Sequence, residues 1–288
     1  MKKSILSMLL GLMVLPFALQ ASDLEKEQRW ADQIVDFLID NGADIHICNN
    51  DGWNALTGAF FKNRTNIVNL LTKKGEAEWL DVGNHEALAI YTESAQDETR
   101  GGVIVVHGSG VHPNWQDVVH PLRTGLAEKG WATLSVQMPV LHNEAEYHEY
   151  APLFDEVAPR LDAAIKNLQD KGIKNISIVA HSLGSAMSAY YLSNHPKAGV
   201  KSFVAIGMPG PRKDPRMDTL SALQKIKLPV LDLYGEKDLD YVLEAAPTRK
   251  QAVEKNRGSQ QMVPVADHFF VGHNTALVDT VDRWLSKQ

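Results

Sequence analysis

The sequence predicts an α/β protein with a mainly parallel sheet that is covered by helices on both faces. From Glu78 to the C-terminus, short strand-like segments alternate with segments in which apolar residues recur at helical spacing. One strand-like segment, Val103–Val106, is a continuous β-branched run, which is typical of a strand buried on both faces. The chain has 288 residues, which is enough for one large domain or two small ones. Its residues are 44% hydrophobic and 22% charged, as in an ordinary soluble globular protein.

The individual elements follow from apolar periodicity and from turn residues. The predicted strands are Trp79–Val82, Ala87–Tyr91, Val103–Val106, Ala132–Val136, Ile176–Val179, Phe203–Ile206, Val230–Tyr234 and Gln261–Val265. The first two strands are expected to form a hairpin around Gly83 and Asn84. The predicted helices are Val118–Leu126, Leu161–Leu168, Ser185–Leu192 and Ala276–Trp284. Gly130 and Gly172 follow the first two helices, as glycine often does at a helix C-terminus.

Residues 1–21 have the pattern of a secretory signal peptide. Lys2 and Lys3 precede the apolar run Ile5–Leu19, and the small residue Ala21 offers a cleavage site. We therefore expect a periplasmic or secreted protein that has no integral membrane span after cleavage. The alternative is an uncleaved N-terminal anchor. Cys48 is the single cysteine, so the chain is expected to have no internal disulfide.

Residues 22–38 are predicted to form an N-terminal helix, and residues 39–75 resemble an ankyrin repeat. The segments Ile34–Gly42 and Ile67–Gly75 are similar at an offset of 33 residues. Between them lies Asp51-Gly52-Trp53-Asn54-Ala55-Leu56-Thr57, which matches the ankyrin pattern in part. This segment is either a helical decoration that packs locally, which we favour, or a surface for a protein partner. Residues 76–288 are then the main domain.

Several function classes find no support in the sequence. The formal net charge is −6 and no basic stretch indicates a nucleic-acid partner. After the first parallel strand comes His107-Gly108-Ser109-Gly110, but Pro113 stands where a dinucleotide fingerprint needs a third glycine. No Walker motif and no His-Glu-x-x-His pair occur, so the sequence predicts neither a cofactor nor a metal site.

Chemically versatile residues follow four of the predicted strands. His107-Gly108, His181-Ser182, Asp238 and His268 come after the strands that end at Val106, Val179, Tyr234 and Val265. In an α/β sheet, functional groups gather at the carboxyl ends of the strands. The chain order Ser, Asp, His is one of the known orders of a catalytic triad, so we expect these side chains to meet at one sheet edge.

The stretch Ile178-Val179-Ala180-His181-Ser182-Leu183-Gly184-Ser185 fits a nucleophile elbow, except that Ala180 replaces the first glycine of G-x-S-x-G. We therefore predict that Ser182 is the nucleophile. Since a neutral hydroxyl is a weak nucleophile, it needs a base, for which His268 is the candidate and His273 the alternative.

The carboxylate that would orient the base is predicted to be Asp238, with Asp232 and Asp240 as alternatives. The predicted oxyanion hole uses the backbone N–H groups of Leu183 and Ser109.

From about Glu78 to Gln288 the chain resembles the α/β-hydrolase superfamily. The motifs Val103-Ile104-Val105-Val106-His107-Gly108, Asp232-Leu233-Tyr234-Gly235 and Ala266-Asp267-His268-Phe269 are closest to an uncharacterised family of exported bacterial proteins with that fold. The resemblance implies the α/β-hydrolase fold and a hydrolase activity, and it supplies no substrate.

The expected substrate is a small or medium ester, thioester or amide. The segments Gly207–Lys227 and Leu141–Phe154 are candidates for a cover over the site, and the first is short and polar, unlike a large apolar lid. The alternative is a non-catalytic α/β-hydrolase-fold protein of the cell envelope that holds a protein partner through the ankyrin-like segment.

Overall fold

A computed structural model of the chain describes residues 75–83, 85–142 and 145–288. The chain divides after Ala77 into two units, and Glu78–Gln288 is the unit described below. The predicted signal peptide 1–21, the helix 22–38 and the ankyrin-like segment 39–75 lie outside the described residues, apart from Gly75.

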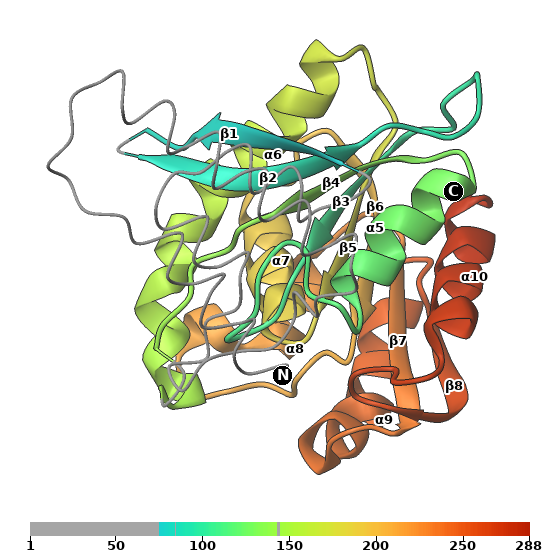
Figure 1. Cartoon of the computed structure of the whole chain (residues 1–288). Helices are drawn as coiled ribbons and strands as arrows, with labels where there is room; N and C mark the ends of the chain where they lie inside the picture. The colour runs from blue at the N-terminus through green and yellow to red at the C-terminus, as the bar shows by residue number, and fades with distance from the viewer. Residues whose placement is uncertain (1–74, 84, 143–144) are drawn as a thin grey trace, which may run out of the picture. The chain divides into compact units, whose positions relative to one another are not determined.

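Eight strands form one sheet in the order β1-β2-β4-β3-β5-β6-β7-β8 (Figure 1). The strands are β1 (Glu76–Asp81), β2 (Glu86–Thr92), β3 (Gly102–Val106), β4 (Ala132–Val136), β5 (Ile176–His181), β6 (Val200–Ile206), β7 (Val230–Lys237) and β8 (Ser259–Asp267). β2 is antiparallel to β4. The remaining neighbours in the sheet, β4-β3-β5-β6-β7-β8, are all paired in parallel. The predicted mainly parallel sheet is therefore confirmed, and its parallel strands end at one edge.

The helices cover both faces of this sheet (Figure 1). Residues of α5 (Val119–Glu128) and α10 (Asn274–Leu285) pack on one face. Residues of α6 (Val157–Asp170), α7 (Leu183–Asn194), α8 (Thr219–Lys225) and α9 (Asp240–Glu254) pack on the other. Two 3₁₀ helices, η1 (Tyr147–Glu156) and the short η2 (Pro215–Met217), lie in the segments after β4 and β6.

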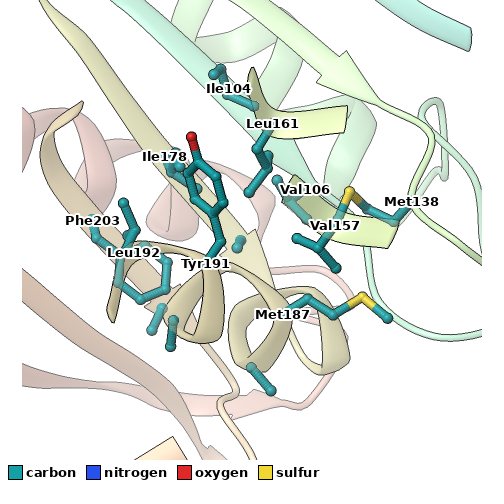
Figure 2. Packing of buried hydrophobic residues seen from close by; sticks show 14 of the residues in the cluster. Ile104, Val106, Met138, Val157, Leu161, Ile178, Met187, Tyr191, Leu192 and Phe203 are labelled. Atoms are coloured by element: carbon teal, nitrogen blue, oxygen red, sulfur yellow. The ribbon is translucent and has the colours of Figure 1, made fainter. Parts of the chain in front are cut away.

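Alternating side chains of the central strands divide the core into two clusters. Ile104 and Ile178 contribute to the larger cluster, which includes Tyr191 of α7 (Figure 2). Val105 and Val179, their neighbours along the strands, contribute to the cluster under α5 and α10. Because both faces are buried, these strands need apolar residues at every position, which explains the continuous β-branched run at Val103–Val106.

The sequence pattern did not predict α8, α9 or the 3₁₀ helices. In α9 the buried positions Val242, Ala246, Arg249 and Val253 have helical spacing, but a buried arginine interrupts the apolar stripe. Pro247 also lies inside this helix. A pattern search that counts apolar residues misses such a helix, since the arginine is buried for a reason that only the tertiary structure supplies.

Candidate active site

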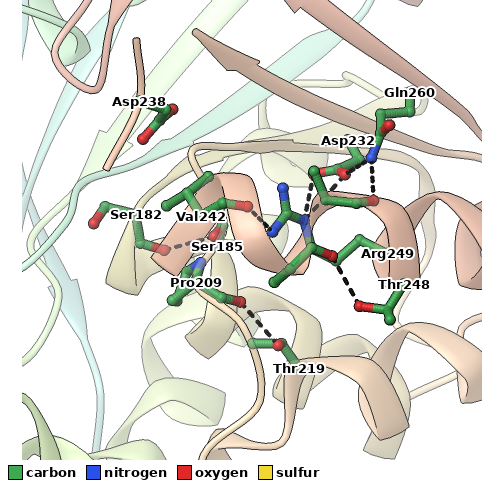
Figure 3. A network of polar contacts seen from close by, with 12 residues as sticks. Ser182, Ser185, Pro209, Thr219, Asp232, Asp238, Val242, Thr248, Arg249 and Gln260 are labelled. Carbon is green, nitrogen blue, oxygen red and sulfur yellow. Dashed lines mark hydrogen bonds and ion pairs between the residues drawn. The ribbon is translucent and has the colours of Figure 1, made fainter. Parts of the chain in front are cut away.

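Ser182 lies on a sharp turn between β5 and α7. Its backbone has φ 51° and ψ −124°, a conformation that residues with a side chain rarely adopt. Its N–H donates to the carbonyl oxygen of Ile206 at 2.8 Å, and the Ser185 hydroxyl donates to the Ser182 carbonyl oxygen at 2.5 Å (Figure 3). These hydrogen bonds fix the turn on both sides of the Ser182 side chain.

The two small residues that flank Ser182 have different environments. A Cβ atom added at Gly184 would lie 2.1 Å from the carbonyl oxygen of His107, so α7 can approach β3 here because residue 184 has no side chain. Ala180 is fully buried, lies opposite Val106 and Ala205 in the sheet, and packs in the larger core cluster. The position at which the motif has its first glycine is therefore an ordinary core position in this chain, and Ala180 fills it.

Three of the predicted side chains form a hydrogen-bonded line. The Ser182 Oγ is 3.0 Å from Nε2 of His268, and Nδ1 of His268 is 2.5 Å from Oδ1 of Asp238. All three residues are at most 9% exposed. The hydroxyl can donate to Nε2 only if Nδ1 carries the proton of the neutral ring, and the Asp238 carboxylate accepts that Nδ1–H. The arrangement is suited to proton transfer from Ser182 to His268.

Asp238 is held as a carboxylate. Its Oδ1 also accepts from the N–H of Leu239 at 2.8 Å, and its Oδ2 accepts from the N–H of Gly235 at 3.2 Å. Burial by itself would raise the pKa of the Asp238 carboxyl, but the hydrogen bonds from His268 and from these backbone groups lower that pKa below its ordinary value.

The alternative residues lie elsewhere. Asp232 is buried in β7, where it accepts two hydrogen bonds from Arg249 at 3.0 Å and one from Gln260 at 2.7 Å (Figure 3). Asp240 is exposed at the first position of α9. His273 is at the N-terminus of α10. The structure thus brings Asp238 and His268 to Ser182, and it does not bring these three alternatives there.

The segment that carries His268 has an unusual backbone. Val265 and Phe270, on either side of His268, have φ angles of 65° and 54°, and the pairing of β8 with β7 shifts register just before His268. Gly207 lies beside the imidazole, because a Cβ added there would be 2.8 Å from Cε1 of His268. A positive φ at a β-branched residue such as Val265 is an outlier, and such outliers concentrate at functional sites.

His181 is a residue whose part in the site the sequence analysis missed. Its Nε2–H donates to the backbone carbonyl oxygen of His268 at 2.9 Å, and the two imidazole rings are 4.8 Å apart. Burial, with the nearby His268, lowers the pKa of His181 to about 3. His181 is therefore neutral at ordinary pH, and it adds no positive charge next to His268. Only its position before the serine could have indicated this role.

The loop after β3 passes directly beside Ser182. A Cβ added at Gly108 would be 3.1 Å from Cβ of Ser182. The buried His107 accepts at Nε2 from the N–H of Met138 at 2.9 Å, which leaves Nδ1–H to donate to the Gly108 carbonyl oxygen at 2.7 Å. Because that peptide bond is trans, the N–H of Ser109 points away from this carbonyl.

The second predicted donor is at the start of α7. Leu183 is the first residue of this helix, so its N–H has no acceptor in a preceding turn. The oxyanion role of Ser109 and Leu183 stays a prediction.

Among the described residues, no group of three or more His, Cys, Asp or Glu side chains could hold a metal ion. In this part of the chain none of the helices combines the length and the apolar character that a membrane span requires.

Comparisons with solved structures find the same fold. Est1E from Butyrivibrio proteoclasticus has a TM-score of 0.59 at 12% identity, over 73% of this chain and 98% of Est1E. A dienelactone hydrolase from Anabaena variabilis has a TM-score of 0.58 at 21% identity, over 74% and 97%. An alpha-beta serine hydrolase homologue from Coxiella burnetii has a TM-score of 0.59 at 18% identity, over 73% and 97%. At these identities the likeness shows the α/β-hydrolase fold.

Comparisons at the level of sequence give one family. Residues 10–154 and 142–286 match the model of a family described as "Protein of unknown function (DUF3530)". The search of curated proteins found no match.

Proposed function

The chain belongs to the family of proteins of unknown function called DUF3530, and from this premise we propose that it is a serine hydrolase that cleaves a small or medium ester, thioester or amide through an acyl-enzyme on Ser182. The observation that carries the proposal is the hydrogen-bonded line from Ser182 through His268 to Asp238. The dienelactone hydrolase and the alpha-beta serine hydrolase homologue that share the fold support the same reaction class.

Acylation begins with proton transfer from the Ser182 hydroxyl to Nε2 of His268. The Oγ attacks the carbonyl carbon, and the negative charge on the carbonyl oxygen is bound by the N–H groups of Leu183 and Ser109. Asp238 stabilises the imidazolium that has formed. His268 then returns the proton to the leaving alcohol, thiol or amine, and the acyl group stays on Oγ.

Deacylation repeats these steps with water. His268 takes a proton from the water, the resulting hydroxide attacks the acyl carbon, and the proton passes from His268 to Oγ as the acid leaves. Each turnover consumes one water and restores Ser182, so the reaction needs no cofactor.

Apolar side chains at the carboxyl edge of the sheet support a substrate with an apolar part. Phe269 is 42% exposed. The centroid of its ring is 5.1 Å from that of the His268 ring and 5.6 Å from that of the Trp115 ring, which it contacts edge to face. Leu239, next to Asp238, is 38% exposed. The segment Gly207–Lys227 folds into η2 and the short α8, and it contains no large apolar lid.

A fluorophosphonate probe tests the proposal, because it reacts with an activated serine. We expect the full chain to be labelled and Ser182→Ala to lose labelling. Ser188→Ala is a matched control, since it removes another buried serine hydroxyl of α7 that has no hydrogen-bond partner among the described residues. This variant should be labelled like wild type. A folded wild type that neither reacts with the probe nor hydrolyses a panel of esters would favour the non-catalytic binding protein.

A panel of acyl esters tests the substrate size. Short and medium acyl chains should be cleaved best. A steep preference for long chains at a lipid interface would contradict this part of the proposal.

We also propose that the protein is exported and that cleavage after Ala21 leaves Ser22 as the first residue. The positive start and apolar run of residues 1–21 support this proposal. The intact mass of protein recovered from the periplasmic or secreted fraction measures it. A mass that includes residues 1–21 would contradict cleavage.

A further inference from the structure

An arginine contacts two tyrosine rings at the same sheet edge as Ser182. The guanidinium carbon of Arg212 is 5.3 Å from the centroid of Tyr147 and 5.3 Å from the centroid of Tyr241. These residues come from the segments that follow β4, β6 and β7. Since β5 ends at this edge as well, the cluster and Ser182 share one end of the sheet.

The charge of Arg212 is not neutralised within the described residues. The guanidinium donates one hydrogen bond within the described residues, a long one of 3.4 Å to the carbonyl oxygen of Pro211, and none of the described carboxylates forms an ion pair with it. Arg216, four residues later, differs in this respect, because it pairs with Asp214 at 2.8 Å and with Asp155 at 3.1 Å. Arg212 is also exposed, so its donors are accessible.

The two tyrosines contact the Arg212 guanidinium and do not neutralise its positive charge. A cation–π contact uses no N–H hydrogen bond of the guanidinium, so the Arg212 donors can still bind a planar acceptor. The Tyr147 hydroxyl is buried, and it has no hydrogen-bond partner among the described residues. Burial raises the pKa of Tyr147 and that of Tyr241, so both phenols stay protonated and neutral beside Arg212.

The cluster adjoins the segments that hold His268 and Asp238. Gly207, which contacts His268, is five residues before Arg212, and a Cβ added at Gly210 would be 3.6 Å from the carbonyl oxygen of Tyr241, so this segment runs from the imidazole to Tyr241. On the other side, Tyr241 is three residues after Asp238. A substrate that has its carbonyl carbon at Ser182 can therefore extend toward the Arg212 guanidinium.

We propose that Arg212 binds a carboxylate carried by the substrate, so that the preferred substrates are half-esters of dicarboxylic acids or esters of hydroxy acids. A carboxylate fits because the guanidinium edge offers two parallel N–H donors to its two oxygens. The net charge of the chain is −6, which disfavours anions at long range, so a preference for a carboxylated ester requires a local cation. This inference rests on the proposed function.

Matched pairs of esters measure this recognition in the full chain. Monomethyl adipate is compared with methyl hexanoate, and acetoxyhexanoate with hexyl acetate, so that the carboxylate is on the acyl side in one pair and on the alcohol side in the other. We expect wild type to favour the carboxylated member of at least one pair by about tenfold or more in kcat/KM, as a charge-assisted hydrogen bond allows.

Two substitutions separate Arg212 from general charge effects. Arg212→Gln should reduce that preference to near unity. Lys213→Gln removes the same charge from the next, exposed residue, which stacks on neither tyrosine, and it should keep the preference. Equal use of both esters by wild type, or loss of the preference in both variants alike, would overturn the inference.

Binding to the Ser182→Ala variant makes the test independent of turnover. Calorimetric titration of this variant with the same esters should show tighter binding of a carboxylated ester, and the difference should disappear in Ser182→Ala/Arg212→Gln. If wild type neither reacts with the fluorophosphonate probe nor cleaves any of the esters, the proposed function fails while this titration still decides on the carboxylate site. If it cleaves the neutral esters alone, the function stands and the carboxylate site is refuted.

Discussion

Replacing Gly184 with alanine is the sharpest perturbation of the site that the structure offers. The new methyl group would lie 2.1 Å from the carbonyl oxygen of His107 and 2.9 Å from Cγ1 of Val106, whereas ordinary contacts begin at 3.4 Å. β3 cannot give way easily, because it pairs with β4 on one side and with β5 on the other. The N-terminus of α7 must therefore move by about 1 Å, and with it Leu183 and the Ser182 turn.

Two effects of Gly184→Ala should follow from that displacement. Overpacking of this kind costs about 1–3 kcal/mol of unfolding free energy, and in a domain of this size each kcal/mol lowers Tm by about 2–4 °C. A displacement of about 1 Å at a reacting group lowers rates on the order of a hundredfold. Thermal unfolding measures the first effect, and the rate of fluorophosphonate labelling measures the second.

Gly172→Ala is the matched control for this experiment. Gly172 lies in the turn after α6, and nothing lies within 4 Å of a Cβ added there. Its φ of 83° makes the substitution strained, so a loss of stability of about 1 kcal/mol is expected, with the labelling rate unchanged. If Gly184→Ala melts at the same temperature as wild type and is labelled at the same rate, the close approach of α7 and β3 does not hold the serine in place.

Three further predictions concern charged and titratable groups. Asp238→Asn should lower kcat by about 10²–10⁴-fold, and Asp240→Asn, an exposed control, should not; ester hydrolysis measures both. Burial lowers the pKa of His107 to about 4, whereas in the unfolded chain it is about 6.5, so only the unfolded state binds a proton between these values. The free energy of unfolding should therefore fall as the pH is lowered from about 6.5 to about 4, by about 1.4 kcal/mol per pH unit from this group, and urea denaturation should find this share missing in His107→Gln. Arg249→Met should cost about 3–5 kcal/mol because it leaves Asp232 buried without its cation, and the double variant with Asp232→Asn should recover part of that loss; a double variant less stable than Arg249→Met would contradict this.

The sheet could be predicted from the sequence because the patterns that indicate its strands are local. The β-branched run at Val103–Val106 and the regular alternation of strands and helices reflect burial that every residue of a central strand experiences. The serine, aspartate and histidine of the candidate site could be found for the same reason, since each directly follows a strand and parallel strands end at one edge.

The remainder of the site depends on contacts between distant segments. Nothing near Arg249 in the sequence indicates that it is buried against Asp232, 17 residues away. Because a buried arginine interrupts the apolar stripe of α9, the apolar pattern did not predict this helix. His181 acquires its role from a carbonyl group 87 residues later in the chain. The contact of Arg212 with two tyrosine rings likewise requires three separate segments to meet. Periodicity carries no information on such pairs.

The turn at Ser182 shows why the two flanking positions of the motif differ in what they tolerate. A strained residue costs on the order of 1–3 kcal/mol, and it persists only where its surroundings determine its conformation. On the strand side, Ala180 is part of a regular ladder, so a methyl group there fills the core and the strain is unaffected. On the helix side, the backbone of α7 lies against the carbonyl of His107, and no room is left for a side chain at Gly184. Gly184 is thus the glycine that the turn at Ser182 requires in this chain, because the absence of a side chain there allows α7 to start close enough to hold the turn.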